Sequence, residues 1–329
     1  MNNVSILDCT LREGGYTNEW NFGYETIKDI IRTLSCANLK YIECGFLKNT
    51  EYNKNLSIFS DISQLQKVIS PKDTSVVYAL MINYGEYPIS KLENCPEENI
   101  AIRVAFKKHE IKEAIEFCSQ IKNKGYKVFV NPMHIYSYEE SELLEILKFT
   151  NEIKPFAFTI VDTTGAMKEK DILNVTKLVD KNLNKEIIIA FHSHNNMQLS
   201  LSNAQYLIKL LPERNLIIDS TLFGMGRGAG NLYTEILAQY INDNCNGNYN
   251  TQEIFKIIDK KIKPVYDKHP WGYAMPYHIA AEYNCHPNYA KFLMEKSNLS
   301  SETIIAILKQ IPEDKKTSYD SELIKHLVK

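Results

Sequence analysis

The chain has 329 residues, of which 44% are hydrophobic and 24% charged, an ordinary globular composition with room for one large domain and an appendage. Its formal charge of -2, with Lys and Arg scattered among Asp and Glu, argues against nucleic acid as a partner. No segment resembles a membrane span or signal peptide, and the seven cysteines show no C-x-x-C spacing, so we expect a cytoplasmic protein without a disulfide framework.

Short apolar, β-branched runs alternate with segments of helical periodicity along the first three-quarters of the chain. This alternation is typical of a parallel sheet covered by helices. The predicted strands are 4–7, 41–44, 75–82, 100–105, 127–130, 156–161, 186–191 and 216–220, and the predicted helices include 24–37, 108–124, 138–153, 169–183 and 196–211. Eight such repeats favour closure into a (β/α)8 barrel, the TIM barrel.

Polar residues stand at or just past the carboxyl end of each predicted strand. They are Asp8, Glu43, Asn83, Arg103, Asn131, Asp162, His192 and Asp219. In a TIM barrel these ends converge on one face, where the loops build the active site, so we expect Asn83 and Arg103 to contact substrate. A doubly wound sheet is the alternative fold, but it would spread these groups along an edge.

The alternation of predicted strands and helices ends near Asn242, and a polar segment leads into a helical, Tyr-rich tail. We therefore expect a TIM-barrel catalytic domain over residues 1–242 and a C-terminal helical domain over residues 251–329. The aromatic residues of the tail, from His269 to Tyr273 and at Tyr277, either pack against the barrel or close its mouth.

Two segments at this face carry groups that bind metals. FHSHNN places His192 and His194 two residues apart on a strand, so both imidazoles share a face and can bind one ion. LDCTLREGG brings Asp8, Arg12 and Glu13 to the end of the first strand. A carboxylate with two histidines gives an open ligand set that suits Mg, Mn, Co or Zn. The alternatives are ordinary core or surface histidines and a surface Arg–Glu pair.

A third segment, GMGRGAGN at residues 224–231, follows the eighth predicted strand. Glycines at alternate positions disfavour a helix or strand interior, so we expect a loop. Its amides, at Gly226 and Gly228, could meet a carboxylate or phosphate. A plain flexible turn is the alternative.

Together these motifs resemble the metal-dependent barrel lyases and synthases, a family that includes pyruvate aldolases, HMG-CoA lyase, and the isopropylmalate and homocitrate synthases. D-x-T-L-R-E, I-E-x-G, V-D-T-T-G, H-S-H-N and G-x-G-x-G-A-G-N occur in the family's order. The resemblance implies Glu13, His192 and His194 as ligands of a divalent metal, foremost Mn or Mg, with Asn231 as a fourth. It also implies that Arg12 neutralises an enolate derived from a 2-oxo acid.

Within this family the chain most resembles 4-hydroxy-2-oxovalerate aldolase, because the glycine loop reads R-G-A-G-N and the tail contains GYAMPY. The tail segment implies a catalytic tyrosine at Tyr273, with Tyr277 as the alternative. Glu43 and Asp162 match acidic residues at the family's barrel mouth, and we expect them to serve in proton transfer or orientation. Tyr16 stands where the aldolases have a loop histidine that acts as acid and base, so we count it among the catalytic residues.

We therefore predict a metal-dependent aldolase that forms or uses a pyruvate-type enolate, with a small 2-oxo acid and an aldehyde as its substrates. One alternative is a Claisen-type acyltransferase that condenses acetyl-CoA with a 2-oxo acid. The other is a non-catalytic barrel subunit, since aldolases of this type pair with an aldehyde dehydrogenase through the helical tail. The sequence is compatible with a homo-oligomer or with such a dehydrogenase partner.

Overall fold

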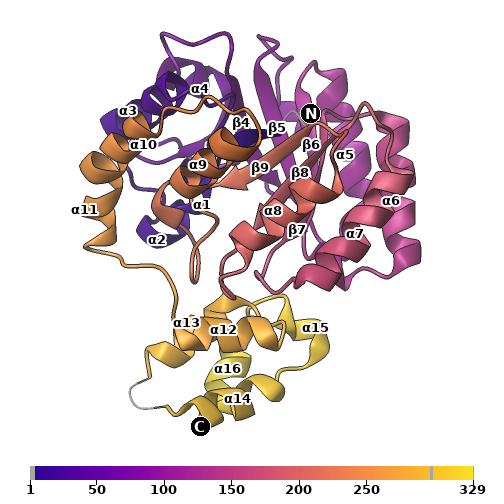
Figure 1. Cartoon of the computed structure of the whole chain (residues 1–329), viewed down its shortest axis with the longest axis vertical. Coiled ribbons are helices and arrows are strands. Elements are labelled where there is room, and N and C mark those ends of the chain that lie inside the picture. The colour runs from indigo at the N-terminus through magenta and orange to yellow at the C-terminus, as the bar shows by residue number, and fades with distance from the viewer. Residues whose placement is uncertain (1–3, 297–298, 329) are drawn as a thin grey trace.

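The computed structural model describes residues 4–296 and 299–328. Residues 1–3 and 329, the outer ends of the two predicted domains, lie outside the described residues. Figure 1 shows a barrel of strands ringed by helices, with a smaller group of helices joined to one end by an extended connection. In the described part of the chain, no helix is both long and apolar enough to cross a membrane.

Eight parallel strands form the barrel, as predicted. They are β1 (Val4–Asp8), β2 (Tyr41–Leu47), β4 (Val77–Asn83), β5 (Ile100–Phe106), β6 (Lys127–Pro132), β7 (Ala157–Asp162), β8 (Ile188–Ser193) and β9 (Leu216–Ser220). The hydrogen-bonded order is β1-β9-β8-β7-β6-β5-β4-β2, and pairing of β1 with β2 closes the ring. The short β3 (Ile58–Phe59) pairs with the end of β2. The (β/α)8 prediction is confirmed.

Helices cover the outside of the barrel. The long ones are α3 (Tyr24–Cys36), α4 (Ile62–Val68), α5 (Ile111–Asn123), α6 (Glu140–Ile153), α7 (Glu169–Asn182), α8 (Ser200–Leu210) and α9 (Thr234–Asn244). The loops contain α1 (Thr10–Glu13), α2 (Gly15–Asn18), η1 (Ile89–Lys91), η2 (Lys108–Glu110), η3 (Ile135–Ser137) and η4 (Leu222–Gly224). Apolar residues at helical spacing, such as Ile27, Ile30 and Leu34 of α3, are buried against the strands.

The helix predicted from residue 196 begins instead at Ser200, because the side chains of Asn195 and Asn196 form hydrogen bonds in the preceding loop. The Asn195 side-chain oxygen accepts a hydrogen bond from the Ser200 hydroxyl at 2.8 Å. The Asn196 amide donates to the Thr164 carbonyl at 2.9 Å. Side chains that bond to backbone in this way compete with helix formation.

The tail packs in two parts. Residues of α10 (Thr251–Ile257) and η5 (Ile258–Ile262) join the barrel's apolar core and continue into α11 (Lys263–Tyr266). The second part, which we call the cap, consists of α12 (Met275–Glu282), α13 (Pro287–Met294), α14 (Ser301–Lys309), α15 (Glu313–Lys316) and α16 (Ser321–Leu327). Its separate apolar core is built by residues of α12, α13, α14 and α16 and of the loops between them. The residues at which the two domains divide remain a prediction.

One large side chain fills much of the barrel interior. Phe129 on β6 is completely buried and belongs to an inner cluster with Ala79, Ala101, Ala157 and Ala190, each from a different strand. The cluster also contains Leu7 and Ile217, and the Phe156 ring packs on Phe129. Since four of the other strands present alanine, the phenyl ring supplies much of the volume that close packing of this layer requires.

Replacing Phe129 with Ala should therefore lower the free energy of unfolding by about 3–5 kcal/mol, because the alanine neighbours cannot close the cavity. Urea denaturation followed by circular dichroism measures this loss. The matched control is Phe255→Ala on α10, where the side chain is 50% exposed and the loss should be small. Equal losses in the two variants would contradict the packing described here.

Candidate active site at the barrel mouth

Two buried histidines and a glutamate meet at the carboxyl ends of the strands. His192 and His194 of β8 and its following loop are 4% and 6% exposed, and Glu13 is 3% exposed. Nε2 of His192 lies 3.6 Å from Oε1 of Glu13, and Nε2 of His194 lies 3.8 Å from Oε2. The structure thus brings together three predicted ligands, whose ligand atoms lie within 4.8 Å of one another. We call them the His–His–Glu group.

The turn after β1 positions Glu13. Oδ1 of Asp8 accepts a hydrogen bond from the Thr10 amide at 3.0 Å, which starts α1 directly at the strand end. The Trp20 indole donates to the Arg12 carbonyl at 2.9 Å and holds the end of the turn. Because the helix begins so close to the strand, the carboxylate of Glu13 stays at the strand ends, beside His192 and His194.

A buried ion network lies beneath the His–His–Glu group. Arg103 on β5 is completely buried and pairs with Asp219 on β9 through Nη2, and with Glu43 on β2 through Nη1 at 3.2 Å. Oδ2 of Asp219 also lies 3.0 Å from Nδ1 of His192. The carboxylate therefore holds the Nδ1 proton and leaves the Nε2 lone pair directed toward Glu13.

Arg12 is held in the same network. Its Nε donates to Oε2 of Glu43 at 2.9 Å, and its Nη1 pairs with Glu13. Within residues 4–296 and 299–328, Nη2 of Arg12 donates no hydrogen bond. Since Arg12 also lines the cavity described below, this nitrogen can donate to a bound oxyanion.

Burial sets the protonation of the two histidines. Loss of solvation lowers the pKa of His192 and holds that of His194 well below its usual value. Burial acting alone would raise the pKa of Asp219, but Arg103 and His192 outweigh it and lower the value. The site therefore presents neutral imidazoles, the form that binds metals, next to an ionised carboxylate.

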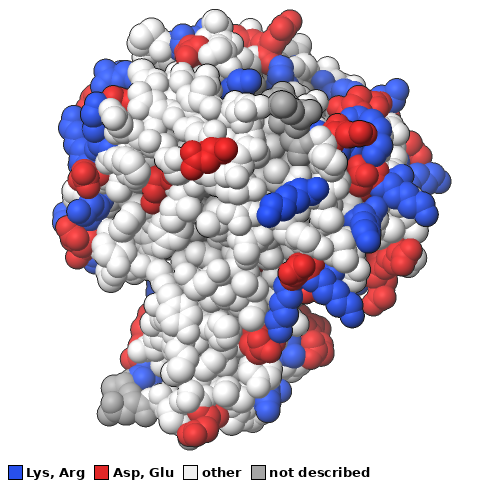
Figure 2. All heavy atoms as spheres, viewed as in Figure 1, with Lys and Arg blue, Asp and Glu red and all other residues white. Residues whose placement is uncertain are grey.

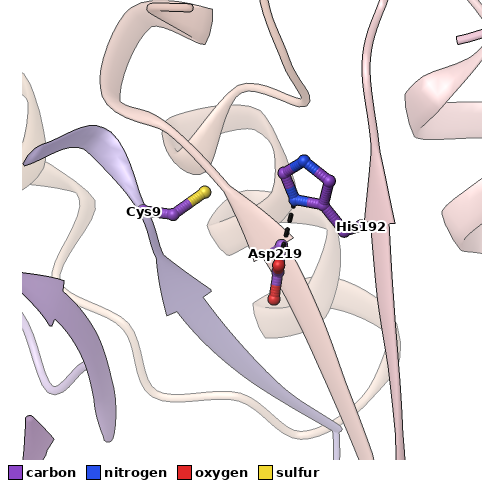
Figure 3. A group of neighbouring side chains, drawn as sticks. All are labelled: Cys9, His192 and Asp219. Atoms are coloured by element: carbon purple, nitrogen blue, oxygen red, sulfur yellow. Dashed lines mark hydrogen bonds and ion pairs between the residues drawn. The ribbon is translucent and has the colours of Figure 1, made fainter. Parts of the chain in front are cut away.

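A second cluster, formed by Cys9, His192 and Asp219, also brings potential ligands together (Figure 3). The Cys9 thiol donates to the Ser220 carbonyl at 3.3 Å, and burial raises its pKa well above the usual value. Asp219 is already engaged by Arg103 and by His192. This cluster is thus better suited to supporting the His–His–Glu group than to holding an ion itself.

The residues present fit a cation at the His–His–Glu group. Two guanidinium groups against three carboxylates leave a buried formal charge of -1 in the cluster of Arg12, Arg103, Glu13, Glu43 and Asp219. Among the described atoms, Oε2 of Glu13 and Oδ1 of Asn231 are buried without a hydrogen bond. Buried oxygens and an uncompensated negative charge are both relieved by a bound cation.

Asn231 is held beside these ligands by the glycine loop. It forms an isolated antiparallel bridge with His194, and its side-chain amide donates to the Met225 carbonyl at 3.3 Å, which leaves the oxygen free. A Cβ on Gly226 would lie 2.0 Å from the Asn231 amide nitrogen, so only glycine permits this arrangement. Gly228 has a φ of 67° and, like Gly226, lines an outer cleft and not the inner cavity.

The His–His–Glu group opens on a small inner cavity of about 80 Å³. Its walls include Asn83, Asn131, Arg12 and the apolar side chains of Phe46 and Met81. Arg103 lies beneath and is not a wall residue. A space of this size, with a few polar groups at one end and apolar walls, suits a small organic anion.

The predicted catalytic tyrosines differ in position. Tyr16 lines the inner cavity, where its ring packs against Trp20 with centroids 4.9 Å apart. Tyr273 is 60% exposed and lies outside the cavity walls, whereas Tyr277 lines the outer cleft between barrel and cap.

Two predicted carboxylates point away from the interior because of strand alternation. The Asp8 side chain does not line the cavity, and its Oδ2 accepts a hydrogen bond from the Thr234 hydroxyl at 2.7 Å. Asp162 accepts hydrogen bonds from the amides of Ala166 and Met167 at 3.0 and 3.1 Å, and burial raises its pKa to about 7. Both carboxylates hold loops in this structure.

Sequence reasoning named Asp219 as a strand-end residue but gave it no role in the site, and it did not single out Arg227 or His286. Alternation along the strand could have identified Asp219. Residues two apart on a strand share a face, and Ile217, two residues earlier, faces the barrel interior. Arg227 lies inside the glycine motif, but its contact with His286 joins residues 59 positions apart. No local pattern indicates such a contact.

The sequence of the chain is similar to those of known proteins. The sequence model of the HMGL-like family matches residues 3–260. The chain is 24% identical to 4-hydroxy-2-oxovalerate aldolase of Geobacillus genomosp. 3 over 238 residues, which is 71% of this chain and 69% of that protein. It is 21% identical to oxaloacetate decarboxylase of Mycobacterium tuberculosis over 287 residues, 84% of this chain and 80% of that protein.

A solved structure is similar over most of the chain. It is the N-terminal domain of a protein assigned as an aldolase from Bacteroides vulgatus, with a TM-score of 0.75 and 27% identity. The match covers 89% of this chain and 97% of that one. The resemblance therefore extends beyond the barrel strands.

The ion network gives a prediction about stability. Glu43→Gln should lower the free energy of unfolding by about 3–5 kcal/mol, because it leaves two buried guanidinium groups without their shared carboxylate. Urea denaturation provides the measurement. Glu322→Gln, which removes an exposed carboxylate paired with Lys325, is the control and should change little. A network of no structural importance would give two indistinguishable denaturation curves.

Proposed function

The chain belongs to the HMGL-like family, and from this membership and the site geometry we propose that it is a divalent-metal-dependent aldolase acting on a 2-oxo acid. The reaction we propose joins the methyl carbon of pyruvate or a close relative to an aldehyde, or cleaves the product. The observation that carries the proposal is the convergence of His192, His194 and Glu13 with Arg12 on one small buried cavity.

The His–His–Glu group, with Asn231 as a fourth donor, would hold the ion. Imidazole nitrogens and carboxylate or amide oxygens suit Mn or Mg, with Co or Zn also compatible. When bound, such an ion polarises the carbonyl of a 2-oxo acid and so makes the neighbouring carbon more acidic. Both imidazoles are neutral, and the Asp219–His192 hydrogen bond leaves Nε2 of His192 available as a ligand atom.

Arg12 would stabilise the enolate. Glu43 and Glu13 fix the guanidinium through Nε and Nη1, so its remaining nitrogen is oriented before substrate binds. A donor held in place in this way favours the charge that develops when the methyl carbon loses a proton. The enolate carbon then forms a bond to the aldehyde carbon while the carbonyl π bond of the aldehyde breaks. The aldehyde oxygen gains one proton, which balances the proton that the methyl carbon lost.

We propose Tyr16 as the residue that exchanges a proton with the aldehyde oxygen, because its side chain lines both the inner cavity and the cleft that leads to it. Glu43 and Asp162 serve in orientation in this proposal, since Glu43 holds two arginines and Asp162 holds the loop after β7. The exposed Tyr273 has no contact with the cavity that would support a catalytic role.

The relative named oxaloacetate decarboxylase supports a second candidate activity. Decarboxylation of a 4-carboxy-2-oxo acid breaks the equivalent carbon–carbon bond and leaves the same enolate, so the same Arg12 and His–His–Glu group would serve. Release of carbon dioxide from oxaloacetate, compared with aldol formation from pyruvate, separates the two activities.

Exchange of the pyruvate methyl protons with deuterium, followed by NMR in the presence of Mn or Mg, tests enolate formation directly. Wild-type protein should catalyse exchange without any aldehyde. Arg12→Lys should lose it by about a hundredfold or more, because an ammonium cannot replace the fixed planar donor.

Arg32→Lys is the matched control, since the Arg32 side chain is 75% exposed and pairs with Asp29, away from the cavity. This variant should exchange at the wild-type rate. Absence of exchange by the wild type with each of the four metals would refute the proposed function. Wild-type exchange by Arg12→Lys would refute the role of Arg12.

Metal binding should also stabilise the fold. An ion present at about a hundred times its Kd adds about 2.7 kcal/mol to the free energy of unfolding, so chelation should lower the melting temperature of the wild type. His194→Ala should remove most of this shift because it removes a ligand. His109→Ala, with a side chain 76% exposed, should keep it. Differential scanning fluorimetry with and without chelator gives the comparison, and identical wild-type curves would argue against a metal site.

A further inference from the structure

A larger cleft lies between the barrel mouth and the cap. Its volume is about 560 Å³, and it shares two lining residues, Tyr16 and Arg227, with the inner cavity. The Arg227 guanidinium lies over the Tyr16 ring, 3.8 Å from the centroid. A substrate with its reacting end in the inner cavity would thus extend past this pair into the cleft.

The lining of the outer cleft is basic. Arg227, Lys268 and Lys291 contribute to it, and no Asp or Glu occurs among the described residues that line it. Elsewhere, positive and negative side chains are mixed, as the face in Figure 2 shows. The single sign of charge in the cleft lining therefore differs from the mixed charges on the face that Figure 2 shows.

These three cations are also unpaired. The chain has five arginines, and Arg12, Arg32, Arg103 and Arg214 each pair with a carboxylate. Within the described part of the chain, Arg227, Lys268 and Lys291 form no ion pair with a carboxylate. Arg227 is half-buried, whereas Lys268 and Lys291 are exposed at the rim of the cleft. A half-buried guanidinium without a protein counter-charge, with further cations beside it, is what an anion site presents before its ligand binds.

The contact between Arg227 and the cap gives an independent reason to expect an anion. Nη1 of Arg227 lies 2.8 Å from Nε2 of His286. Nδ1 of His286 accepts the backbone amide hydrogen of Asn288 at 3.1 Å, so a neutral ring carries its proton on Nε2. The Nη1–H of Arg227 and the Nε2–H of His286 are then two donors that face each other. If the ring proton were on Nδ1 instead, Nδ1–H would face the amide N–H of Asn288 in the same way. An oxyanion beside the Arg227–His286 pair, on the side of the cleft, would accept from both donors.

We propose that the outer cleft binds a carboxylate or phosphate group at the far end of the aldehyde-derived part of the substrate, through Arg227, His286 and the two lysines. This inference rests on the proposed function and specifies its substrate class. The inner cavity takes the 2-oxo acid, and the cleft selects aldehydes that carry an anionic group beyond the reacting carbon.

Paired aldehydes test the proposal. With pyruvate and Mn, kcat/KM is measured for butanal against succinic semialdehyde, and for glycolaldehyde against its phosphate. We expect the anionic member of at least one pair to be favoured by about tenfold or more, the factor that one charge-assisted hydrogen bond supports. The pair with the larger preference distinguishes a carboxylate from a phosphate.

The variants Arg227→Gln and Lys291→Gln should each reduce this preference, expressed as the ratio of kcat/KM within a pair. Using the ratio removes any general effect of the substitution on enolate formation. Lys325→Gln on α16, outside the cleft, is the matched control and should leave the ratio unchanged.

Deuterium exchange into pyruvate needs no aldehyde. It therefore tests enolate formation separately from anion binding in the outer cleft. Exchange with no anionic preference in either pair would overturn the anion site and leave the aldolase proposal standing. Loss of exchange as well would mean that the proposed function has failed. A preference that survives in both Arg227→Gln and Lys291→Gln would also overturn the assignment of the site to this cleft.

Discussion

A single buried guanidinium group ties the mouth of the barrel together. Arg103 reaches from β5 to Glu43 on β2 and to Asp219 on β9, and all three side chains are almost fully removed from solvent. A charge buried this deeply is tolerated only while its partners remain in place. Those partners in turn orient Arg12 and His192, so the arrangement of the candidate metal ligands depends on Arg103 although it forms no wall of the cavity.

Much of the fold could be predicted from the sequence because its signals are local. Apolar runs and helical periodicity gave all eight barrel strands to within three residues at each end. The two-residue period of a strand also explains why His192 and His194 face the same way. Which face of the strand a residue lies on is harder to predict. Asp8 and Asp162 are polar strand ends like the site residues, but each directly follows an inward-facing residue, Leu7 or Val161, and therefore points outward.

Other features depend on irregularity or on distant contacts. The register of β2 against β4 shifts between Glu43 and Gly45, and this bulge turns Phe46 toward the cavity. A Cβ on Gly45 would lie 1.9 Å from the Ser57 carbonyl oxygen, a clash with a residue that only the folded chain brings near. The meeting of Arg227 with His286 likewise requires the cap to be docked, which no periodicity in the sequence indicates.

The cap has its own apolar core, and it reaches the outer cleft through side chains such as His286 and Lys291. The buried network around Arg103 lies entirely within the barrel. Selection of the substrate's far end would then be shared between Arg227 of the barrel and residues of the separately packed cap, whereas generation of its reactive carbon would belong to the barrel alone. Such a division lets substitutions accumulate in the cap and change which molecules are accepted, while the barrel keeps its charge balance intact.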